Sequence, residues 1–334
     1  MLLARLSEAA GVSSQETEIR GLVKTEAAKP GVEIQTDALG NVMAYKRGRK
    51  NGPTIMVAAH MDEVGLMVVG VENSGLLRFK PVGGIDRRVL VAKEVLVGPD
   101  RIPGVIGSKP IHLQKRNERN TPLEWNELYI DIGARNKDEA EKLVPIGTTA
   151  IFATTFESLS DEIIMGKAFD DRVGCYVLLE LLDEEYDCNL VCAFTVQEEV
   201  GLRGASVAAY GVNPDLALVI EGTTASDVPG VPSHAHATTV GKGPALTVMD
   251  RATIPAPALV EMLKDVAAQE SIPTQFRRAT TGGTDAGVIR LTKGGIPVAG
   301  VSVPCRYIHS PASVASLRDI EATIRLVKGF LQRY

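Results

Sequence analysis

Residues 166–172 read Gly-Lys-Ala-Phe-Asp-Asp-Arg and lie near the middle of the 334-residue chain. They follow a short apolar run at 163–164 and precede a stretch, 173–182, in which apolar residues recur at helical spacing. The segment therefore predicts a junction between an apolar run and a helix, with two adjacent carboxylates at the junction. Buried without partners, those carboxylates would be energetically costly. A divalent cation would offset that cost, and we expect Asp170 to bridge two metal ions.

The bulk composition is typical of a globular protein and excludes several kinds of partner. Of the residues, 45% are hydrophobic and 23% are charged. The formal net charge of −5 argues against nucleic acid as a partner. Aromatic residues make up only 4%, so a carbohydrate or nucleic-acid platform of stacked rings is not expected.

The sequence also predicts a cytoplasmic location without a membrane span. The apolar run at the start of the sequence is too short for a signal peptide, and the residues just after it are too acidic. No window approaches the roughly 18 apolar residues of a membrane-spanning helix. None of the cysteines forms a close CxxC pair, and we expect all of them to be reduced and structural. They are Cys175, Cys188, Cys192 and Cys305.

The first 160 residues show two different patterns. The early part predicts a capping box at Ser13–Glu16, two strands turned at Gly40-Asn41, and a continuous buried strand at Thr54–Ala59. From about Leu66 to Glu157, short β-rich runs alternate with Gly, Pro and Asn turns, and helical periodicity is nearly absent. This second pattern is typical of a small β-barrel or sandwich inserted into the first domain.

After residue 166 strands and helices alternate again. The expected helices are 171–183, 203–210, 257–269, one opening at Gly282–Asp285, and 314–331; the expected strands are 190–195, 216–220, 274–277 and 296–303. This alternation predicts an α/β fold with a mostly parallel, mixed sheet covered by helices on both faces. We expect the α/β domain to comprise residues 1–65 and 161–334, and the inserted all-β domain to comprise residues 66–160.

Side chains that bind metals follow each buried strand of the α/β domain. They are His60 and Asp62 after 54–59, Glu198 and Glu199 after 190–196, Glu221 after 216–220, and His309 after 296–303. Open α/β sheets place their sites at the carboxyl ends of strands, so we expect these side chains to gather around Asp170. One histidine at a strand end is weak evidence, but five imidazole or carboxylate sites at element ends, these four and Asp170, are much less often accidental.

The residue types suit two divalent ions held by imidazole nitrogen and carboxylate oxygen. Two ions about 3.5–4 Å apart need a bridging carboxylate, here Asp170. One ion could then take His60 and Glu221, and the other Glu199 and His309. Asp62 is expected to face the same side as His60 and to hold its imidazole in place without binding a metal itself. Glu198 remains as a free carboxylate beside water, which is the position of a general base.

These motifs resemble the tetrahedral aminopeptidase family, the co-catalytic dimetal aminopeptidases of the glutamyl and deblocking type in clan MH. The resemblance covers nearly the whole chain. Its motifs are Gly11-Val-Ser-Ser, Ala59-His-Met-Asp-Glu-Val-Gly65, Gly104-Val-Ile-Gly, Lys109-Pro-Ile-His112, Gly166-Lys-Ala-Phe-Asp-Asp-Arg172, Gln197-Glu-Glu-Val-Gly201 and Gly282-Gly-Thr-Asp285. Together they are specific, whereas the acidic pairs alone are not.

The resemblance implies a PDZ-like β-barrel insert that serves dimerisation and assembly, two zinc or cobalt ions per subunit, and release of N-terminal residues from short peptides. It also implies a hollow tetrahedral dodecamer built from dimers, and a cis peptide bond between Asp170 and Asp171. By position it assigns the bridge to Asp170, the remaining metal ligands to His60, Glu221, Glu199 and His309, the base to Glu198 and the orientation of His60 to Asp62. Many members have Asp where this chain has Glu221, and Asp227 is the alternative ligand.

Some assignments stay open at this level. His112 is interpreted as structural, while His234 and His236 either line the substrate entrance or lie in a solvated loop. Residues 282–284 either present backbone N–H groups to a substrate carbonyl or form only a turn and helix cap. The rival functions are a deacylase or carboxypeptidase on the same dimetal scaffold, and a non-catalytic assembly protein with a structural metal site. A glycosidase would need a carboxylate pair without metal, which the clustered ligands disfavour.

Overall fold

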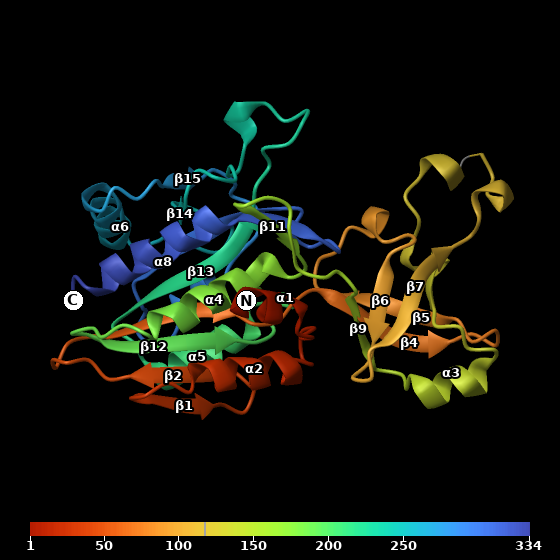
Figure 1. Cartoon of the computed structure of the whole chain (residues 1–334), viewed down its shortest axis with the longest axis horizontal. Coiled ribbons are helices and arrows are strands. Elements are labelled where there is room, and N and C mark those ends of the chain that lie inside the picture. Colours follow the sequence, from red (N-terminus) through yellow and green to blue (C-terminus); the bar gives the residue numbers. More distant parts are fainter. Residues whose placement is uncertain (117) are drawn as a thin grey trace.

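The computed structural model describes residues 1–116 and 118–334. One mixed eleven-stranded sheet forms the larger part of the molecule, and a closed six-stranded β-barrel lies beside it (Figure 1). The predicted α/β fold with a small inserted all-β barrel is therefore confirmed. No described helix has both the length and the apolar character needed to cross a membrane.

The centre of the large sheet consists of four parallel strands. In spatial order they are β12 (Asn189–Thr195), β3 (Thr54–His60), β13 (Leu216–Thr224) and β16 (Val298–Arg306). Antiparallel strands extend the sheet on both sides: β1 (Val32–Thr36) and β2 (Val42–Lys46) beyond β12, and β17 (Ser313–Ser316), β11 (Ile163–Gly166) and β10 (Glu157–Ser158) beyond β16. Two short strands, β14 (Ala245–Thr247) and β15 (Gln275–Arg277), pair beside β16. Parallel pairing is thus concentrated where the ligand-bearing strands lie.

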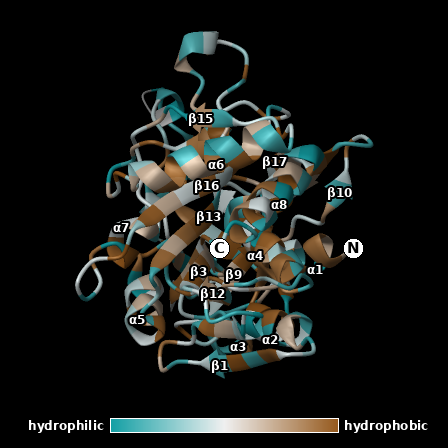
Figure 2. Cartoon of the chain, turned by 90° about the vertical axis from the view of Figure 1, so that its left-hand side faces the viewer, coloured by the Kyte–Doolittle hydropathy of each residue, from teal (hydrophilic) through white to brown (hydrophobic). Residues whose placement is uncertain are grey.

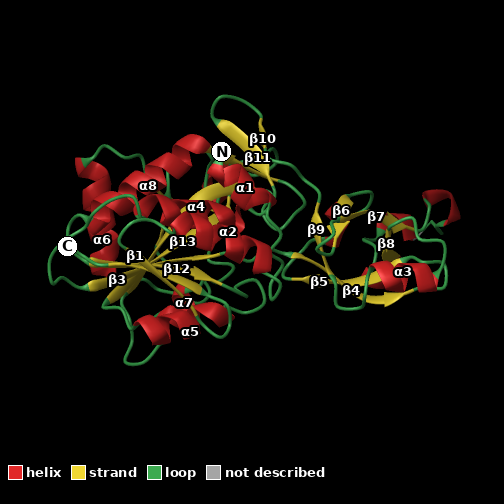
Figure 3. Cartoon of the chain, turned by 60° about the horizontal axis from the view of Figure 1, so that its bottom comes forward, coloured by secondary structure: helices red, strands yellow, loops and turns green. Residues whose placement is uncertain are grey.

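Helices cover both faces of this sheet (Figure 3). One face carries α2 (Thr17–Ala27), α4 (Phe169–Leu181), α6 (Pro257–Gln269) and α8 (Leu317–Leu331), with α1 (Leu2–Glu8) against α4; the other carries α5 (Arg203–Val212) and α7 (Ala286–Ile289). The central strands are almost wholly buried, and β13 and β16 are largely coloured as hydrophobic in Figure 2. Burial on both faces explains why these strands are continuous apolar runs.

The barrel has its own apolar core. Its strands are β4 (Gly65–Val71), β5 (Leu77–Val82), β6 (Glu94–Val97), β7 (Ile102–Ser108), β8 (Leu128–Asp131) and β9 (Thr149–Phe152), closed by pairing of β4 with β9. The helix α3 (Lys137–Leu143) packs against it. Alternate residues such as Leu66, Val68 and Phe79 point into the core, which matches the period-two pattern of the sequence.

Two local predictions are wrong. The capping box at Ser13–Glu16 does not form, because the Ser13 hydroxyl donates instead to Oδ2 of Asp62 at 2.6 Å, and α2 has no side-chain cap. The closing helix begins at Leu317 rather than at residue 314, because 313–316 pair as β17 with β11 and β16. All four cysteines are buried and free, as expected.

Candidate metal centre

The four central strands deliver the predicted ligands to one edge of the sheet. His60 is the last residue of β3 and lies beside Thr195, the last residue of β12. Glu221 is part of β13, the next strand, so its side chain is fixed by the sheet rather than by a loop. Parallel strands end at a common edge, which is why residues far apart in sequence meet here.

Asp170 connects two groups of side chains. Its Oδ1 lies 3.3 Å from Nε2 of His60, and its Oδ2 lies 3.3 Å from Nε2 of His309. Around His60, Oε2 of Glu221 lies 3.5 Å from Nε2; around His309, Oε1 of Glu199 lies 3.3 Å from Nε2. Each histidine is therefore paired with one further carboxylate, and the two groups share Asp170.

The backbone at Asp170 has an unusual conformation, and its carboxyl group is held in the ionised form. Its peptide bond to Asp171 is cis, and both residues have non-helical backbone angles although they lie at the start of α4. Asp171 accepts a hydrogen bond from the backbone N–H of Gly174 at 3.0 Å, so it caps the helix that follows. Burial would raise the pKa of Asp170, but hydrogen bonds to His309 and His60 hold it well below its usual value.

Asp62 organises the chain around His60. Its Oδ1 accepts from the backbone N–H of Glu198 at 3.0 Å, and its Oδ2 accepts from that of Glu199 at 3.2 Å. Nδ1 of His60 lies 3.1 Å from the backbone oxygen of Asp62 and 3.5 Å from Oδ1. The side chain thus holds the Glu198–Glu199 turn, while His60 is oriented mainly through the backbone carbonyl.

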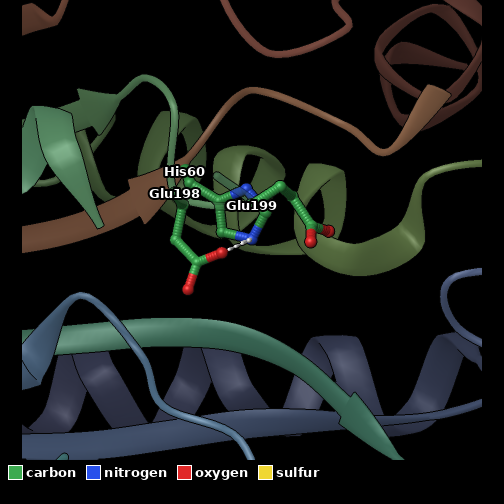
Figure 4. A group of neighbouring side chains, drawn as sticks. All are labelled: His60, Glu198 and Glu199. Carbon is green, nitrogen blue, oxygen red and sulfur yellow. Dashed lines mark ion pairs between the residues drawn. The ribbon is translucent and has the colours of Figure 1, made fainter. Parts of the chain in front are cut away.

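Glu198 and Glu199 lie on opposite sides of the His60 ring (Figure 4). Oε2 of Glu198 is 4.0 Å from Nε2 of His60, farther than Asp170 or Glu221. Burial, then the nearby carboxylates led by Asp285, raise the pKa of Glu198 well above its usual value, although His60 opposes the shift. A carboxyl with a raised pKa in a cleft is suited to taking up a proton.

The chemistry of these donors fits divalent metal. Buried oxygens of Glu199 (Oε1), Glu221 (Oε1) and Asp171 (Oδ2) have no hydrogen-bond partner, which is unusual for buried polar atoms. Three triads have donor atoms within 4.8 Å of one another: His60, Asp171 and Glu221; Asp170, Glu199 and His309; and His60, Glu198 and Glu199. The third triad means that distance alone leaves Glu198 as either a base or a ligand.

The barrel insert contributes to the site directly. The backbone oxygen of Gly84, just after β5, accepts a hydrogen bond from Nδ1 of His309 at 2.8 Å. A Cβ atom at Gly84 would lie 3.3 Å from the same Nδ1, so a side chain there would crowd the ring. His309 is consequently oriented by the inserted domain, a contact that the sequence pattern did not reveal.

A buried ionic cluster anchors the loop after β3. Glu63 accepts hydrogen bonds from Nζ of Lys167 at 2.8 and 2.7 Å, and Nη2 of Arg172 lies 3.2 Å from its Oε1. All three side chains are at most 2% exposed. Lys167 and Arg172 flank Asp170 in the 166–172 stretch, so the cluster joins that stretch to the His60 loop. This cluster was not predicted from the sequence, and the only hint of it in the sequence is the presence of Lys167 and Arg172 in the 166–172 stretch.

A cavity of about 450 Å³ opens onto the two groups. Its lining includes five of the predicted site residues together with Arg277 and residues 281–284; the five are His60, Asp170, Glu198, Glu221 and His309. Asp227, the alternative ligand, instead forms an ion pair with Arg306. His112, His234 and His236 are not among the lining residues, and His236 lies in a separate cavity.

An α/β sheet with paired histidine–carboxylate groups at its carboxyl edge is the arrangement of a metal-dependent hydrolase. Residues 40–326 match the model of the M42 glutamyl aminopeptidase family. The lysyl aminopeptidase of Pyrococcus furiosus is 34% identical over 345 residues, covering 99% of this chain and 96% of the relative. The chain belongs to the M42 family and is a metallo-aminopeptidase.

Solved structures agree with this assignment. An aminopeptidase from the archaeon Desulfurococcus kamchatkensis superposes with a TM-score of 0.96 at 39% identity, covering 100% of this chain and 94% of that chain. The TET1 peptidase of Pyrococcus horikoshii, described as assembling into a tetrahedron or a large octahedral shell, superposes with a TM-score of 0.89 at 32% identity, covering 100% and 99%. The resemblance to the tetrahedral aminopeptidases is therefore confirmed.

Proposed function

We propose that this enzyme releases N-terminal residues from short peptides with two divalent ions, zinc or cobalt, and a glutamate general base. The observation that carries the proposal is the shared position of Asp170, whose two carboxylate oxygens each lie 3.3 Å from a different histidine. Asp170 would bridge the ions. His60 and Glu221 would complete the coordination of one ion, and Glu199 and His309 that of the other.

Glu221, rather than Asp227, is proposed as the ligand at this position. Its Oε2 faces His60 at 3.5 Å, and its buried Oε1 has no hydrogen-bond partner. Asp227 is bound by Arg306 and is not available for this role.

The bound ions would supply polarisation of the scissile carbonyl and a lowered pKa for water. Glu198 would take the proton of the attacking water and later give it to the leaving amine. The raised pKa of Glu198 suits this proton transfer. Glu198 belongs to neither histidine–carboxylate pair, so its carboxylate is free to act as the base. Asp62 would act by positioning, since it holds the backbone of Glu198 and Glu199.

Assembly and location belong to the same proposal. A tetrahedral dodecamer built from dimers is supported by the described assembly of the TET1 relative. Residues 66–160 are proposed as the dimerisation and assembly domain, between the two parts of the catalytic domain, 1–65 and 161–334. A cytoplasmic location is supported by the four free cysteines.

The test uses leucine p-nitroanilide and its N-acetylated form. We expect hydrolysis of the free-amine substrate only, loss of activity with a chelator, and recovery on adding zinc or cobalt. Release of acetate from the acetylated form, without release of p-nitroaniline from the free-amine form, would favour a deacylase. Metal binding without hydrolysis of any substrate would favour a structural site. Size-exclusion chromatography with light scattering would report the assembly separately.

A further inference from the structure

Arg277 stands apart from the other residues that line the substrate cavity. It is the last residue of β15, and among the described lining residues it is the one lysine or arginine. The lining also includes residues 281–284, and a Cβ atom at Gly282 would lie 3.6 Å from Nη2 of Arg277. The same lining includes the carboxylates of the metal centre.

The guanidinium is nine-tenths buried and poorly satisfied. Its side chain is 10% exposed, and among the described residues it donates one hydrogen bond, from Nη2 to the backbone oxygen of Thr281 at 2.8 Å. Nε and Nη1 are buried without a hydrogen-bond partner. Arginine has five N–H donors, and leaving buried donors unpaired is costly.

Asp250 does not remove this deficit. Its Oδ2 is 3.9 Å from Nη1 of Arg277, which is too long for a hydrogen bond. Its Oδ1 is already used by the backbone N–H groups of Ala252 and Thr253, both at 2.7 Å. Asp250 therefore lies near the guanidinium without completing its hydrogen bonding, and two donors of Arg277, a residue of the cavity lining, stay unpaired.

We infer that Arg277 forms a carboxylate-binding subsite for the peptide substrate. Carboxylate is the ligand that best matches an arginine donor set, and a partly desolvated site strengthens the pairing. The carboxylate has two sources in a short peptide: the side chain of an acidic first residue, or the chain terminus of a dipeptide. Because the ligand is a peptide, this inference rests on the proposed function.

Kinetics on metal-loaded enzyme separate the two sources. The first arm compares glutamyl with glutaminyl p-nitroanilide, which differ only in the side-chain carboxylate. The second compares Leu-Leu with Leu-Leu amide, which differ at the terminus. Arg277→Met removes the charge, Arg277→Lys keeps it, and Arg278→Met is the matched control because Arg278 is exposed and lies outside this cavity.

We expect wild type and Arg278→Met to prefer the carboxylate form in one arm by about tenfold or more in kcat/KM. Arg277→Met should lose that preference, while the uncharged substrate of the pair changes little and so shows that the protein is folded. Arg277→Lys should keep part of the preference. Two results would overturn the inference. The wild type could show equal kcat/KM for the two substrates of each pair, or Arg277→Met could keep the wild-type preference for the carboxylate form.

A binding measurement tests carboxylate binding at Arg277 independently of peptide hydrolysis. Calorimetric titration of the same variants with glutamate, glutamine, Leu-Leu and Leu-Leu amide after chelation needs no turnover. Tighter binding of a carboxylate form that disappears in Arg277→Met would support the subsite even if no peptide is hydrolysed. Equal affinity for both members of each pair would contradict it, even in an active aminopeptidase.

Discussion

The Nδ1 atom of His60 lies 3.1 Å from the backbone oxygen of Asp62 and 3.5 Å from Oδ1 of the same residue. With its hydrogen directed at these oxygens, the ring presents Nε2 to Asp170 and Glu221. A residue two positions along the chain thus sets the orientation of the imidazole. Burial would raise the pKa of Asp62, but His60 and Ser13 help hold it below its usual value, so it stays an acceptor.

Asp62→Ala should lower metal affinity by about 10–100-fold, because it removes the carboxylate that holds the Glu198–Glu199 turn, although the backbone oxygen that faces His60 stays in place. The backbone of Glu198 and Glu199 would lose its acceptor at the same time. Competition with a chromophoric chelator measures the affinity. Ser13→Ala, which removes only one hydrogen bond to Asp62, is the control and should have a smaller effect. Wild-type affinity in Asp62→Ala would exclude the positioning role.

Glu63→Gln should destabilise the fold by about 3–5 kcal/mol, since it leaves Lys167 and Arg172 as buried cations without a counter-charge. Thermal unfolding followed by circular dichroism measures the effect. Glu72→Gln is the matched control, because its partner Arg78 is 38% exposed and such surface pairs contribute about 0–1 kcal/mol. Equal melting temperatures for the two variants would show that the cluster is not an anchor.

His309→Ala should reduce the metal content toward one ion per chain. The second group would keep only Asp170 and Glu199, whereas His60 and Glu221 are untouched. Plasma-emission analysis after dialysis gives the stoichiometry. Two ions retained in the variant would remove His309 from the ligand set.

Metal binding should weaken as pH falls. Burial would lower the pKa of His309, but its hydrogen bond to Asp170 and the charge of Glu199 help raise it to about 9. Below that pH the ring holds a proton that an entering ion must displace, so apparent affinity should fall about tenfold per pH unit for each proton displaced. Chelator competition between pH 6 and 9 tests this; a flat profile would mean that no ligand is protonated there.

The elements that carry the ligands could be predicted because they are locally encoded. The apolar run of β3, the helical spacing after Asp171 and the alternation of the barrel strands each reflect one stretch of chain. Once those strands are parallel neighbours, their ends must meet, so gathering His60 with Glu221 needed no long-range information.

Contacts between distant residues could not be predicted in this way. Ser13 has the sequence of a cap, yet its hydroxyl is taken by Asp62, 49 positions away. Residues 314–316 were predicted as the start of the closing helix, but they pair with β11 as part of the strand β17. Gly84 reaches His309 only because the barrel folds back onto the site. In each case tertiary structure offered a better partner than the local pattern did.

The most direct test of the account is Glu198→Gln, assayed for metal content and kcat on the same preparation. We expect two ions per chain and a kcat lower by about 10²–10⁴-fold, because the amide keeps the shape but cannot accept the proton. Two results would contradict the account. Wild-type kcat would remove Glu198 as the base, and loss of an ion would make it a ligand with His60 and Glu199.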